Sequence, residues 1–418
     1  MRRSSRSTTA SASPGCRPNA GTGSVSHDPR QIVNIVFVLP VGEYYSQEWT
    51  GAIATITRHL ARELDVLGHE AIVLAPDDGA ALYAEGSPRR LAYGPAHAVS
   101  TLDRAASGLL ARADRSAGSG DHRRYLRAVT RSLAELPGPV DAVVVANDPL
   151  AAARLSRRRV GRRVLLWLHN RLEGAEAEPL RDLPAEVVVV AVSEAVAAWT
   201  RDRYLPRRDI RVIHSGVDLR QFAPRTDWLD AGDPVRVVCH GRLDPNKGHE
   251  SAAEAVRLLR EEGLPVEFTL IGQVRTFGFS RQAEEAYRRR LEAAVTSADG
   301  TQVGWLPHAA LAEELRTHDI ACVLSRVDEP FGLVNLEAMA SGCAIVATRR
   351  GGIPEAVGAA GVFVDADAPR KVADALRHWV LHREALATAK RDARRQAERF
   401  PWSATAAGLI DLLRPGAC

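Results

Sequence analysis

The stretch Val235-Arg-Val-Val-Cys-His240 runs directly into the loop Gly241-Arg-Leu-Asp-Pro-Asn-Lys-Gly248, and apolar residues at helical spacing follow the loop. A short apolar run of this kind is typical of a buried strand. The apolar positions after the loop, among them Ala252, Val256 and Leu259, predict one face of a helix. The stretch therefore predicts a strand–loop–helix unit, the building block of a parallel α/β sheet.

Two basic residues lie on that loop. The forked guanidinium of Arg242 and the compact ammonium of Lys247 could clamp the same diphosphate. Lysine accounts for only three of the 55 Lys and Arg residues, so Lys247 stands where the chain otherwise uses arginine. An ammonium that gives charge or a proton to a leaving phosphate would explain this choice. A solvated basic turn is the alternative interpretation.

A second stretch, Glu329-Pro-Phe-Gly-Leu-Val-Asn-Leu-Glu337, places one carboxylate before a glycine-opened helix and another inside it. Gly332 begins a run with helical apolar spacing that Ser341-Gly342 ends. The free amides and dipole of such a helix start favour a phosphate, and both carboxylates can accept hydrogen bonds from hydroxyls nearby. This predicts a nucleotide-sugar pocket. The alternative is a solvated helix whose glutamates have no function.

Strand-like and helical runs alternate throughout the chain, which predicts an α/β fold with two parallel, Rossmann-like sheets whose ligand cleft lies at the carboxyl ends of the strands. The predicted domains are an acceptor-binding domain over 31–218 and a nucleotide-sugar-binding domain over 235–399. Leu219–Asp233 is the expected linker, and 400–418 is expected to hold a helix that crosses back to the first domain. Further strands are predicted at Ile32–Leu39, Ala71–Ala75, Ala142–Ala146, Val164–Leu168, Val187–Val192, Val266–Ile271, Ile320–Leu324, Ala344–Thr348 and Gly361–Val364.

Composition narrows the class of protein. A chain of 418 residues suits two domains, and a net charge of +4 gives no reason to expect nucleic acid. Residues 1–30 are Ser-, Arg-, Gly- and Pro-rich without an apolar run, which predicts a disordered extension or a misassigned start rather than a secretory signal. Five scattered cysteines suit reduced thiols in a cytoplasm. The basic run Arg154–Arg163 could contact an anionic membrane or be an exposed helix end, and no apolar run is long enough to cross a bilayer.

Together these motifs resemble the family-4 retaining glycosyltransferases of GT-B fold (glycosyl transferases group 1). The resemblance is detailed over Val235–Val357, where GRLDPNKG, Ile271-Gly272, Gly304-Trp-Leu-Pro307 and EPFGLVNLEAMASGCAIVATRRGGIPE occur, and looser over Val33–Asp218. It implies that Glu329 binds the donor sugar and Glu337 the ribose. It also implies that the diphosphate is held by Arg242, Lys247 and the amides of Phe331, Gly332 and Leu333.

The resemblance assigns two positions in the first half. The family usually carries two adjacent glycines at its first helix start. Here Thr50-Gly51 stands in their place, so only Gly51 carries over, as a close neighbour of the diphosphate and acceptor. His169 follows a predicted strand and precedes Asn170, which implies a catalytic hydrogen bond to the donor sugar near the reacting centre. A purely structural histidine is the alternative.

The resemblance further implies retention by front-face displacement, with the departing phosphate taking the acceptor proton and with no metal or other cofactor. A double displacement through a carboxylate is the other retaining route. Asp365-Ala-Asp367 spells an acidic triplet found in metal-dependent glycosyltransferases, but it follows a late strand away from the donor motifs. We therefore expect no metal site there.

Donor and acceptor identity are less well specified. UDP-GlcNAc is the first choice of donor because most relatives in the family use a UDP-sugar. Acidic loops favour a soluble, cationic acceptor such as an aminoglycoside antibiotic intermediate, although these loops could simply be solvated. The predicted acceptor-binding residues are Glu48, Trp49, Asp148 and Glu173, with Glu43, Glu176 and Glu178 on the same or neighbouring loops.

Other functions stay open at this stage. One is a glycosyltransferase with a lipid-linked or cell-envelope acceptor. Another is a non-catalytic nucleotide-sugar-binding protein, which would be expected to lack Arg242, Lys247 or Glu329, yet all three are present. A nicotinamide-dependent dehydrogenase is disfavoured because no G-x-G-x-x-G follows the first strand. The sequence indicates no oligomeric state.

Overall fold

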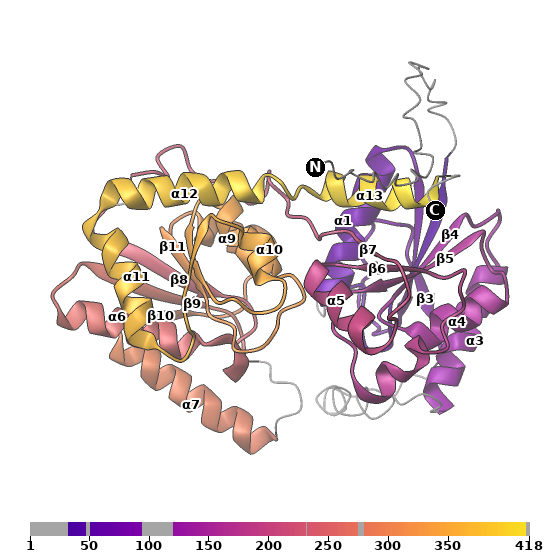
Figure 1. The fold of residues 1–418 in the computed structure, drawn as a ribbon, viewed down its shortest axis with the longest axis horizontal. Coiled ribbons are helices and arrows are strands. Elements are labelled where there is room, and N and C mark those ends of the chain that lie inside the picture. The colour runs from indigo at the N-terminus through magenta and orange to yellow at the C-terminus, as the bar shows by residue number, and fades with distance from the viewer. Residues whose placement is uncertain (1–31, 47–50, 94–119, 231, 275–279, 415–418) are drawn as a thin grey trace, which may run out of the picture. The chain divides into compact units, whose positions relative to one another are not determined.

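The computed structural model describes residues 32–46, 51–93, 120–230, 232–274 and 280–414. Within them the chain forms two parallel β-sheets, each with helices around it (Figure 1), and both sheets belong to one unit that begins at Val33. The chain does not divide into separate compact units between the two sheets, so the domain bounds predicted from the sequence stay predictions. The α/β class with two Rossmann-like sheets is confirmed.

The first sheet has the strand order β3-β2-β1-β4-β5-β6-β7, with every neighbouring pair parallel. Its central strands are runs of valine, leucine and isoleucine that are almost wholly buried, as strands covered on both faces must be. Chain order reverses at β1, which lies between β2 and β4, and such reversal points open a crevice at the carboxyl ends of the strands. The bounds are β1 Asn34–Val38, β2 Glu70–Pro76, β3 Arg89–Leu91, β4 Ala142–Ala146, β5 Arg163–Leu168, β6 Val188–Ala191 and β7 Ile210–Val212.

The second sheet repeats this plan with the order β10-β9-β8-β11-β12-β13, again fully parallel. Its reversal point is β8, the strand quoted at the start, between β9 and β11. The bounds are β8 Val235–His240, β9 Val266–Ile271, β10 Thr301–Val303, β11 Ile320–Val323, β12 Ala344–Ala347 and β13 Gly361–Phe363.

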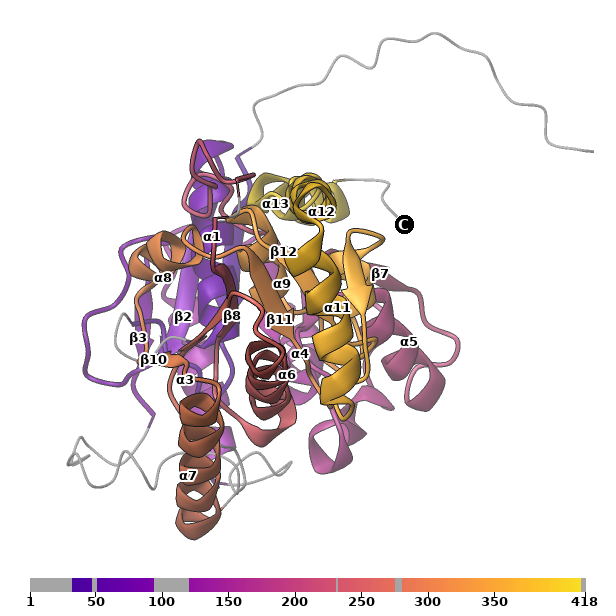
Figure 2. The same cartoon turned by 90° about the vertical axis from the view of Figure 1, so that its left-hand side faces the viewer.

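Helices connect the strands and cover both sheets; α6 and α11, for example, lie side by side (Figure 2). Their amphipathic spacing explains the packing, since α1 buries Ile53, Leu60 and Leu64 along one stripe. The helix bounds are α1 Ala52–Val66, α3 Gly120–Ala134, α4 Pro149–Arg157, α5 Glu194–Arg203, α6 His249–Glu261, α7 Arg281–Ser297, α8 His308–Leu315, α9 Leu333–Ala340, α10 Ile353–Val357, α11 Pro369–Leu381, α12 Arg383–Ala397 and α13 Trp402–Leu413.

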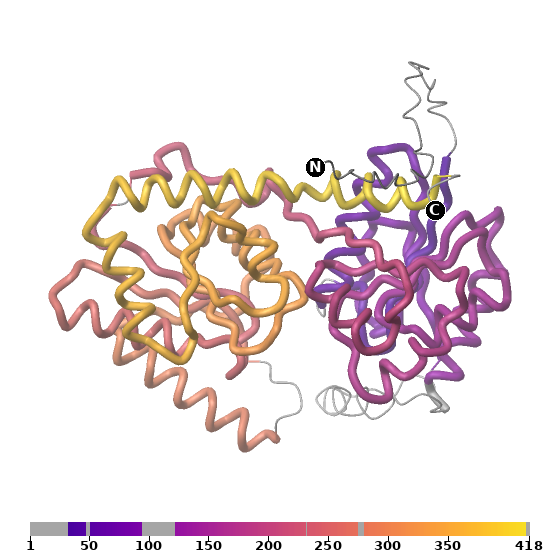
Figure 3. The backbone as a smooth tube through the Cα atoms, in the orientation of Figure 1, coloured from indigo at the N-terminus to yellow at the C-terminus, as the bar shows by residue number. Residues whose placement is uncertain are grey.

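The last helix returns to the first sheet, as the tube in Figure 3 shows. Helix α13 packs against α1, where the Trp402 ring stacks on His59 with ring centres 4.9 Å apart. The amide of Val217 donates to the carbonyl of Phe400 at 2.8 Å. The segment that leaves the first sheet and the segment that returns to it therefore lie side by side here. The predicted crossing helix is therefore present.

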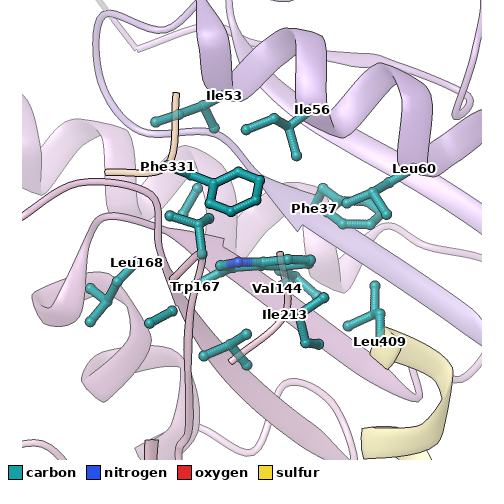
Figure 4. Close-up of a cluster of buried hydrophobic side chains, with 14 of the residues drawn as sticks. Phe37, Ile53, Ile56, Leu60, Val144, Trp167, Leu168, Ile213, Phe331 and Leu409 are labelled. Carbon is teal, nitrogen blue, oxygen red and sulfur yellow. The ribbon is translucent and has the colours of Figure 1, made fainter. Parts of the chain in front are cut away.

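One hydrophobic cluster joins the two sheets. Phe331, from the loop after β11, lies among Ile53, Ile56 and Trp167 of the first sheet and its first helix (Figure 4). Its ring is 2% exposed. The loop that carries Glu329 is therefore packed against the first sheet through the neighbouring apolar side chain.

Candidate functional site

A cavity of about 830 Å³ lies at the carboxyl ends of both sets of strands. Its lining includes the loops after β1, β4 and β5 of the first sheet and those after β8, β9 and β11 of the second. This is where open α/β sheets bind ligands. The lining contains Gly51, Asp148, His169, Arg242, Lys247, Glu329, Phe331, Leu333 and Glu337 from the sequence prediction.

Lys247 and Glu329 form an ion pair in this cavity, from the Nζ of the lysine to the Oε1 of the glutamate. Ser325 donates its hydroxyl to the same oxygen. Burial disfavours a charged Glu329, but the charge of Lys247, its hydrogen bond and that of Ser325 outweigh burial, so the pKa of Glu329 lies below its usual value. Residues 82 positions apart in sequence thus form a carboxylate–ammonium pair that faces the cavity.

Local backbone geometry places Lys247. Pro245–Lys247 is a single 3₁₀ turn that begins after Asp244, whose side chain accepts a hydrogen bond from the amide of Asn246 at 2.9 Å. Gly248 then adopts a left-handed conformation, with φ +68°, to start α6. A Cβ at Gly248 would lie 2.2 Å from the carbonyl oxygen of Leu324, so the loop needs glycine there for two reasons.

Arg242 precedes that turn and also lines the cavity. Its Nε lies 3.9 Å from a carboxylate oxygen of the buried Asp244, and its charge contributes to the low pKa of Glu329. The two cations of the predicted clamp therefore line the cavity together with Glu329. Their role in holding a diphosphate stays a prediction.

The N-cap of helix α9, Gly332, lies three residues after Glu329. Gly332 has φ +93°, and a Cβ there would lie 2.5 Å from the side-chain nitrogen of Asn335. The side chain of Asn335 donates back to the Gly332 carbonyl at 3.2 Å, which fixes the turn. First-turn amides of a helix have no acceptor within the helix, so Leu333 and the residues before it present donors beside Phe331.

Glu337 lies inside α9 and contacts two histidines that the sequence analysis did not single out. The Nε2 of His240 is 3.3 Å from one carboxylate oxygen, and the Nε2 of His308 is 4.0 Å from the other. Burial raises the pKa of Glu337, but these histidines lower it more, and the net pKa is below the usual value. His240 ends strand β8, a position that could have marked it as cavity-facing.

His169 is the first residue after β5 and is 7% exposed. Its ring stacks on Trp167 with centres 5.4 Å apart, and its amide donates to the side-chain oxygen of Asn147 at 2.7 Å. Burial lowers the pKa of His169 to about 3, so the imidazole is neutral near pH 7. Its Nδ1 is buried and has no hydrogen-bond partner among the described residues.

Of the four residues predicted to bind the acceptor, the structure places one in the cavity lining. Asp148 lines the cavity, but it caps α4 through the amide of Ala151 at 2.8 Å and pairs with His122 Nε2 at 2.7 Å. Glu173 precedes a short 3₁₀ turn and is not among the cavity-lining residues, whereas Glu176 is. Glu48 and Trp49 lie outside the described residues. The acceptor roles of all four stay predictions.

Gly51 is the N-cap of α1, and the carboxylate of Glu43 fills the space beside it. A Cβ on Gly51 would lie 2.3 Å from a Glu43 oxygen, which also accepts a hydrogen bond from the amide of Ala54 at 2.8 Å. Only glycine fits here while Glu43 caps the helix. The start of α1 thus binds a carboxylate of its own chain.

The acidic triplet after β13 makes contacts within its own loop and with a neighbouring loop. Asp367 pairs with Arg326 at 2.7 Å, and Asp365 accepts a hydrogen bond from the amide of Asp367 at 3.0 Å. In the part of the chain that the structure describes, no group of three His, Cys, Asp or Glu side chains is arranged to hold a metal ion. In the same residues, no helix is long and apolar enough to span a membrane.

Two family models match the chain. Residues 53–221 match the model described as Glycosyltransferase Family 4, and residues 224–396 match Glycosyl transferases group 1. The second match contains the Arg242–Lys247 loop and α9, and the first contains His169. The two matches therefore include most of the cavity lining from both sheets, but the loop after β1 and Gly51 precede the first match.

Curated relatives are similar over part of their length. The D-inositol 3-phosphate glycosyltransferase of Segniliparus rotundus is 32% identical over 57% of this chain and 56% of its own length. Spore coat protein SA of Bacillus subtilis is 26% identical over 70% of this chain and 82% of its own. The chain thus spans little more than half the length of the first of these relatives.

Solved structures share the fold over nearly the whole chain. Sucrose-phosphate synthase from Thermosynechococcus elongatus superposes with a TM-score of 0.69 at 20% identity, over 91% of this chain and 98% of its own. Anabaena HepE in complex with UDP and glucose gives 0.65 at 17% identity, over 91% and 99%. With both family models matched and this fold shared, the chain belongs to the family-4 glycosyltransferases of GT-B fold.

Proposed function

We propose that this protein transfers a hexose or N-acetylhexosamine from a nucleotide sugar to an acceptor hydroxyl, with retention of configuration. The observation that carries the proposal is the grouping of Lys247, Arg242 and Glu329 beside the start of α9. Two cations and a helix start suit a diphosphate, and a buried carboxylate suits the hydroxyls of the attached sugar. UDP-GlcNAc is the proposed donor.

Each side chain then has a distinct task. Arg242 and Lys247 bind the diphosphate together with the amides of Phe331, Gly332 and Leu333; of these five residues, all but Gly332 line the cavity. Glu329, kept ionised by its low pKa, accepts hydrogen bonds from the sugar, and Glu337 accepts them from the ribose. The bond between Lys247 and Glu329 supports a role for the ammonium beside both the sugar and the diphosphate.

In the reaction, the bond between the sugar C1 and the phosphate oxygen breaks, and a bond from C1 to the acceptor oxygen forms on the same face. The acceptor proton passes to the departing phosphate oxygen. Arg242, Lys247 and the α9 amides stabilise the charge that develops on the diphosphate, which is the main source of rate enhancement in such a site. His169, neutral near pH 7, hydrogen-bonds a sugar hydroxyl. The proposed mechanism uses no metal.

The proposed acceptor is a soluble, cationic molecule such as an aminoglycoside antibiotic intermediate. Glu43, Asp148 and Glu176 line the cavity on the side of the first sheet. Although Glu43 and Asp148 also cap α1 and α4, the negative charge of this side favours a positively charged acceptor. Arg171 lies on the same side, but its charge is paired with Asp328. A cytoplasmic site of action is part of the proposal, supported by the buried free thiols of Cys239, Cys322 and Cys343.

A nucleotide-sugar panel tests the donor side. Thermal shift with UDP-GlcNAc, UDP-Glc, GDP-Man and ADP-Glc should show one nucleotide class that stabilises the protein, and transfer from that donor should follow. Lys247→Ala and Glu329→Ala should each lower transfer at least a hundredfold, because both act where charge or hydroxyl contacts define the transition state. Lys371→Ala and Glu261→Ala, on exposed helix positions of the second sheet, are matched controls. No stabilisation by any nucleotide sugar would contradict the proposal.

A further inference from the structure

An ion pair links the two loops that carry Glu329 and His169. Asp328 directly precedes Glu329 on the loop after β11, and Arg171 follows His169 by two positions on the loop after β5. The Nη1 of Arg171 donates to the Oδ2 of Asp328. The Arg171 guanidinium also lies 4.8 Å above the Trp199 ring, and its side chain is 19% exposed. The guanidinium is therefore held by the carboxylate of Asp328 and by the ring of Trp199.

The donor-side loop is shaped by the backbone that follows β12. The Oδ1 of Asp328 accepts a hydrogen bond from the amide of Gly351 at 2.9 Å, and the carbonyl of Glu329 accepts one from the amide of Gly352 at 2.8 Å. A Cβ on Gly351 would lie 2.1 Å from the Glu329 carbonyl oxygen. Asp328 thus uses one oxygen to fix the loop and the other to join it to the first sheet.

Further hydrogen bonds from Ser193 and to Glu355 join the same regions. Ser193 donates its hydroxyl to the carbonyl of Pro330. The carboxylate of Glu355 on α10 accepts the amides of Glu194 and Ala195 at the start of α5, at 2.7 and 2.8 Å. These contacts keep the two sides together, so the loss of Arg171 alone would loosen the Glu329 loop without separating the sheets.

We propose that Arg171 is a positioning residue: through its pair with Asp328, it sets where the Glu329 carboxylate lies relative to His169. The inference rests on the proposed function, because it assigns both Glu329 and His169 to the donor sugar. Arg171 acts through Asp328 and not by contact with the substrate. Small misplacements at a reacting centre have large effects on rate, whereas diphosphate affinity depends on Arg242 and Lys247.

The first test is a double-mutant cycle on the full chain with Arg171→Met, Asp328→Asn and both together. Each single variant should lower kcat about tenfold to a hundredfold and leave donor KM within about twofold. The double variant should be no more than about threefold worse than the poorer single one. Arg171→Lys, which keeps a charge but loses the planar fork, should recover part of the rate.

Arg181→Met is the matched control. Arg181 makes the same two kinds of contact, an ion pair with Glu178 at 3.3 Å and a cation–π contact with Tyr204 at 5.2 Å, but both lie within the first sheet's own layer of loops and helices. Its kcat should equal that of the unmodified protein. Additive losses in the cycle, a donor KM that rises as kcat falls, or an equal loss in the control would each overturn the inference. A kcat for Arg171→Met far below that of Asp328→Asn would show that Arg171 contacts the substrate directly, which would also overturn the inference.

Hydrogen exchange gives a readout that does not need transfer. Amides of the segment 328–336 should exchange at least about fivefold faster in Arg171→Met than in the unmodified protein, with little change in Arg181→Met. Unchanged exchange together with unchanged kcat would refute the positioning role. If no nucleotide binds the unmodified protein while exchange still responds to Arg171, the proposed function fails and the loop coupling stands.

Discussion

Lys247→Met should destabilise the folded protein because it leaves the Glu329 carboxylate buried without its ammonium partner. Removing one partner of a buried ion pair costs about 3–5 kcal/mol. The Lys247 and Glu329 side chains are 21% and 13% exposed, and Ser325 still donates its hydroxyl to the glutamate. We therefore expect a smaller loss of roughly 1–3 kcal/mol in the free energy of unfolding at pH 7.

The loss should depend on pH in a defined direction. The pKa of Glu329 is below its usual value in the folded protein, so its pairing contributes stability above the unfolded pKa, which is about 4.3 for glutamate, and loses it as pH falls through the folded pKa. In Lys247→Met, burial is less opposed and the pKa of Glu329 should rise. The two proteins should therefore differ most near neutral pH and converge in acid.

Urea unfolding at pH 7 and at about pH 4 measures this difference. Lys371→Met, at an exposed position of α11, controls for loss of a positive charge. Lys247→Met combined with Glu329→Gln should recover most of the stability, since no uncompensated charge stays buried. Equal destabilisation at both pH values, or no recovery in the double variant, would refute the view that this pair is held in a partly desolvated site.

Three further outcomes are expected. His169→Gln should lower kcat at least tenfold, and because the pKa of His169 is about 3, the unmodified protein should show no inflection from this group in its pH–rate profile between pH 5 and 8. Gly351→Ala should lower kcat at least tenfold, since its φ is +55° and the new Cβ would meet the Glu329 carbonyl, whereas Gly138→Ala, with nothing within 4 Å, should be silent in the same assay. Transfer should persist in excess EDTA; loss that Mn²⁺ restores would contradict the metal-free mechanism.

Continuous apolar runs made most of the fold predictable. Strands β4, β8 and β9 occupy the residues predicted for them, because buried parallel strands consist almost entirely of apolar side chains. The strands β3, β7 and β10 were missed. Each has three residues, with exposed or half-exposed positions, at an edge or outer position of a sheet, so neither length nor periodicity marks it.

The candidate site was predictable where motif and backbone geometry coincide. The glycine-opened helix at Gly332 and the basic loop ending at Lys247 both occur as expected. The pairing of Glu337 with His240 and His308 was not predictable, because the partners lie on separate strands and helices and meet only in the folded chain.

The roles of the acidic side chains in the first half were harder to predict, because two of these carboxylates bind the start of a nearby helix. Asp148 was predicted as an acceptor ligand from its charge, and this role stays a prediction. The Asp148-Pro149 pair is also a helix-start signal, and the carboxylate caps α4. Gly51 was predicted as a neighbour of the diphosphate and acceptor, which also stays a prediction, and the Glu43 carboxylate lies in the space beside it. Sequence spacing could not show that a residue of the preceding loop folds back onto the helix start.

The central claim is that a nucleoside diphosphate lies between the two cations of the second sheet and the start of α9. A crystal structure with the nucleotide that stabilises the protein most tests it directly. The account predicts both phosphates within hydrogen-bond distance of Arg242, Lys247 and the amides at Gly332 and Leu333. A nucleotide bound against the first sheet alone, or phosphates that contact neither cation, would contradict it.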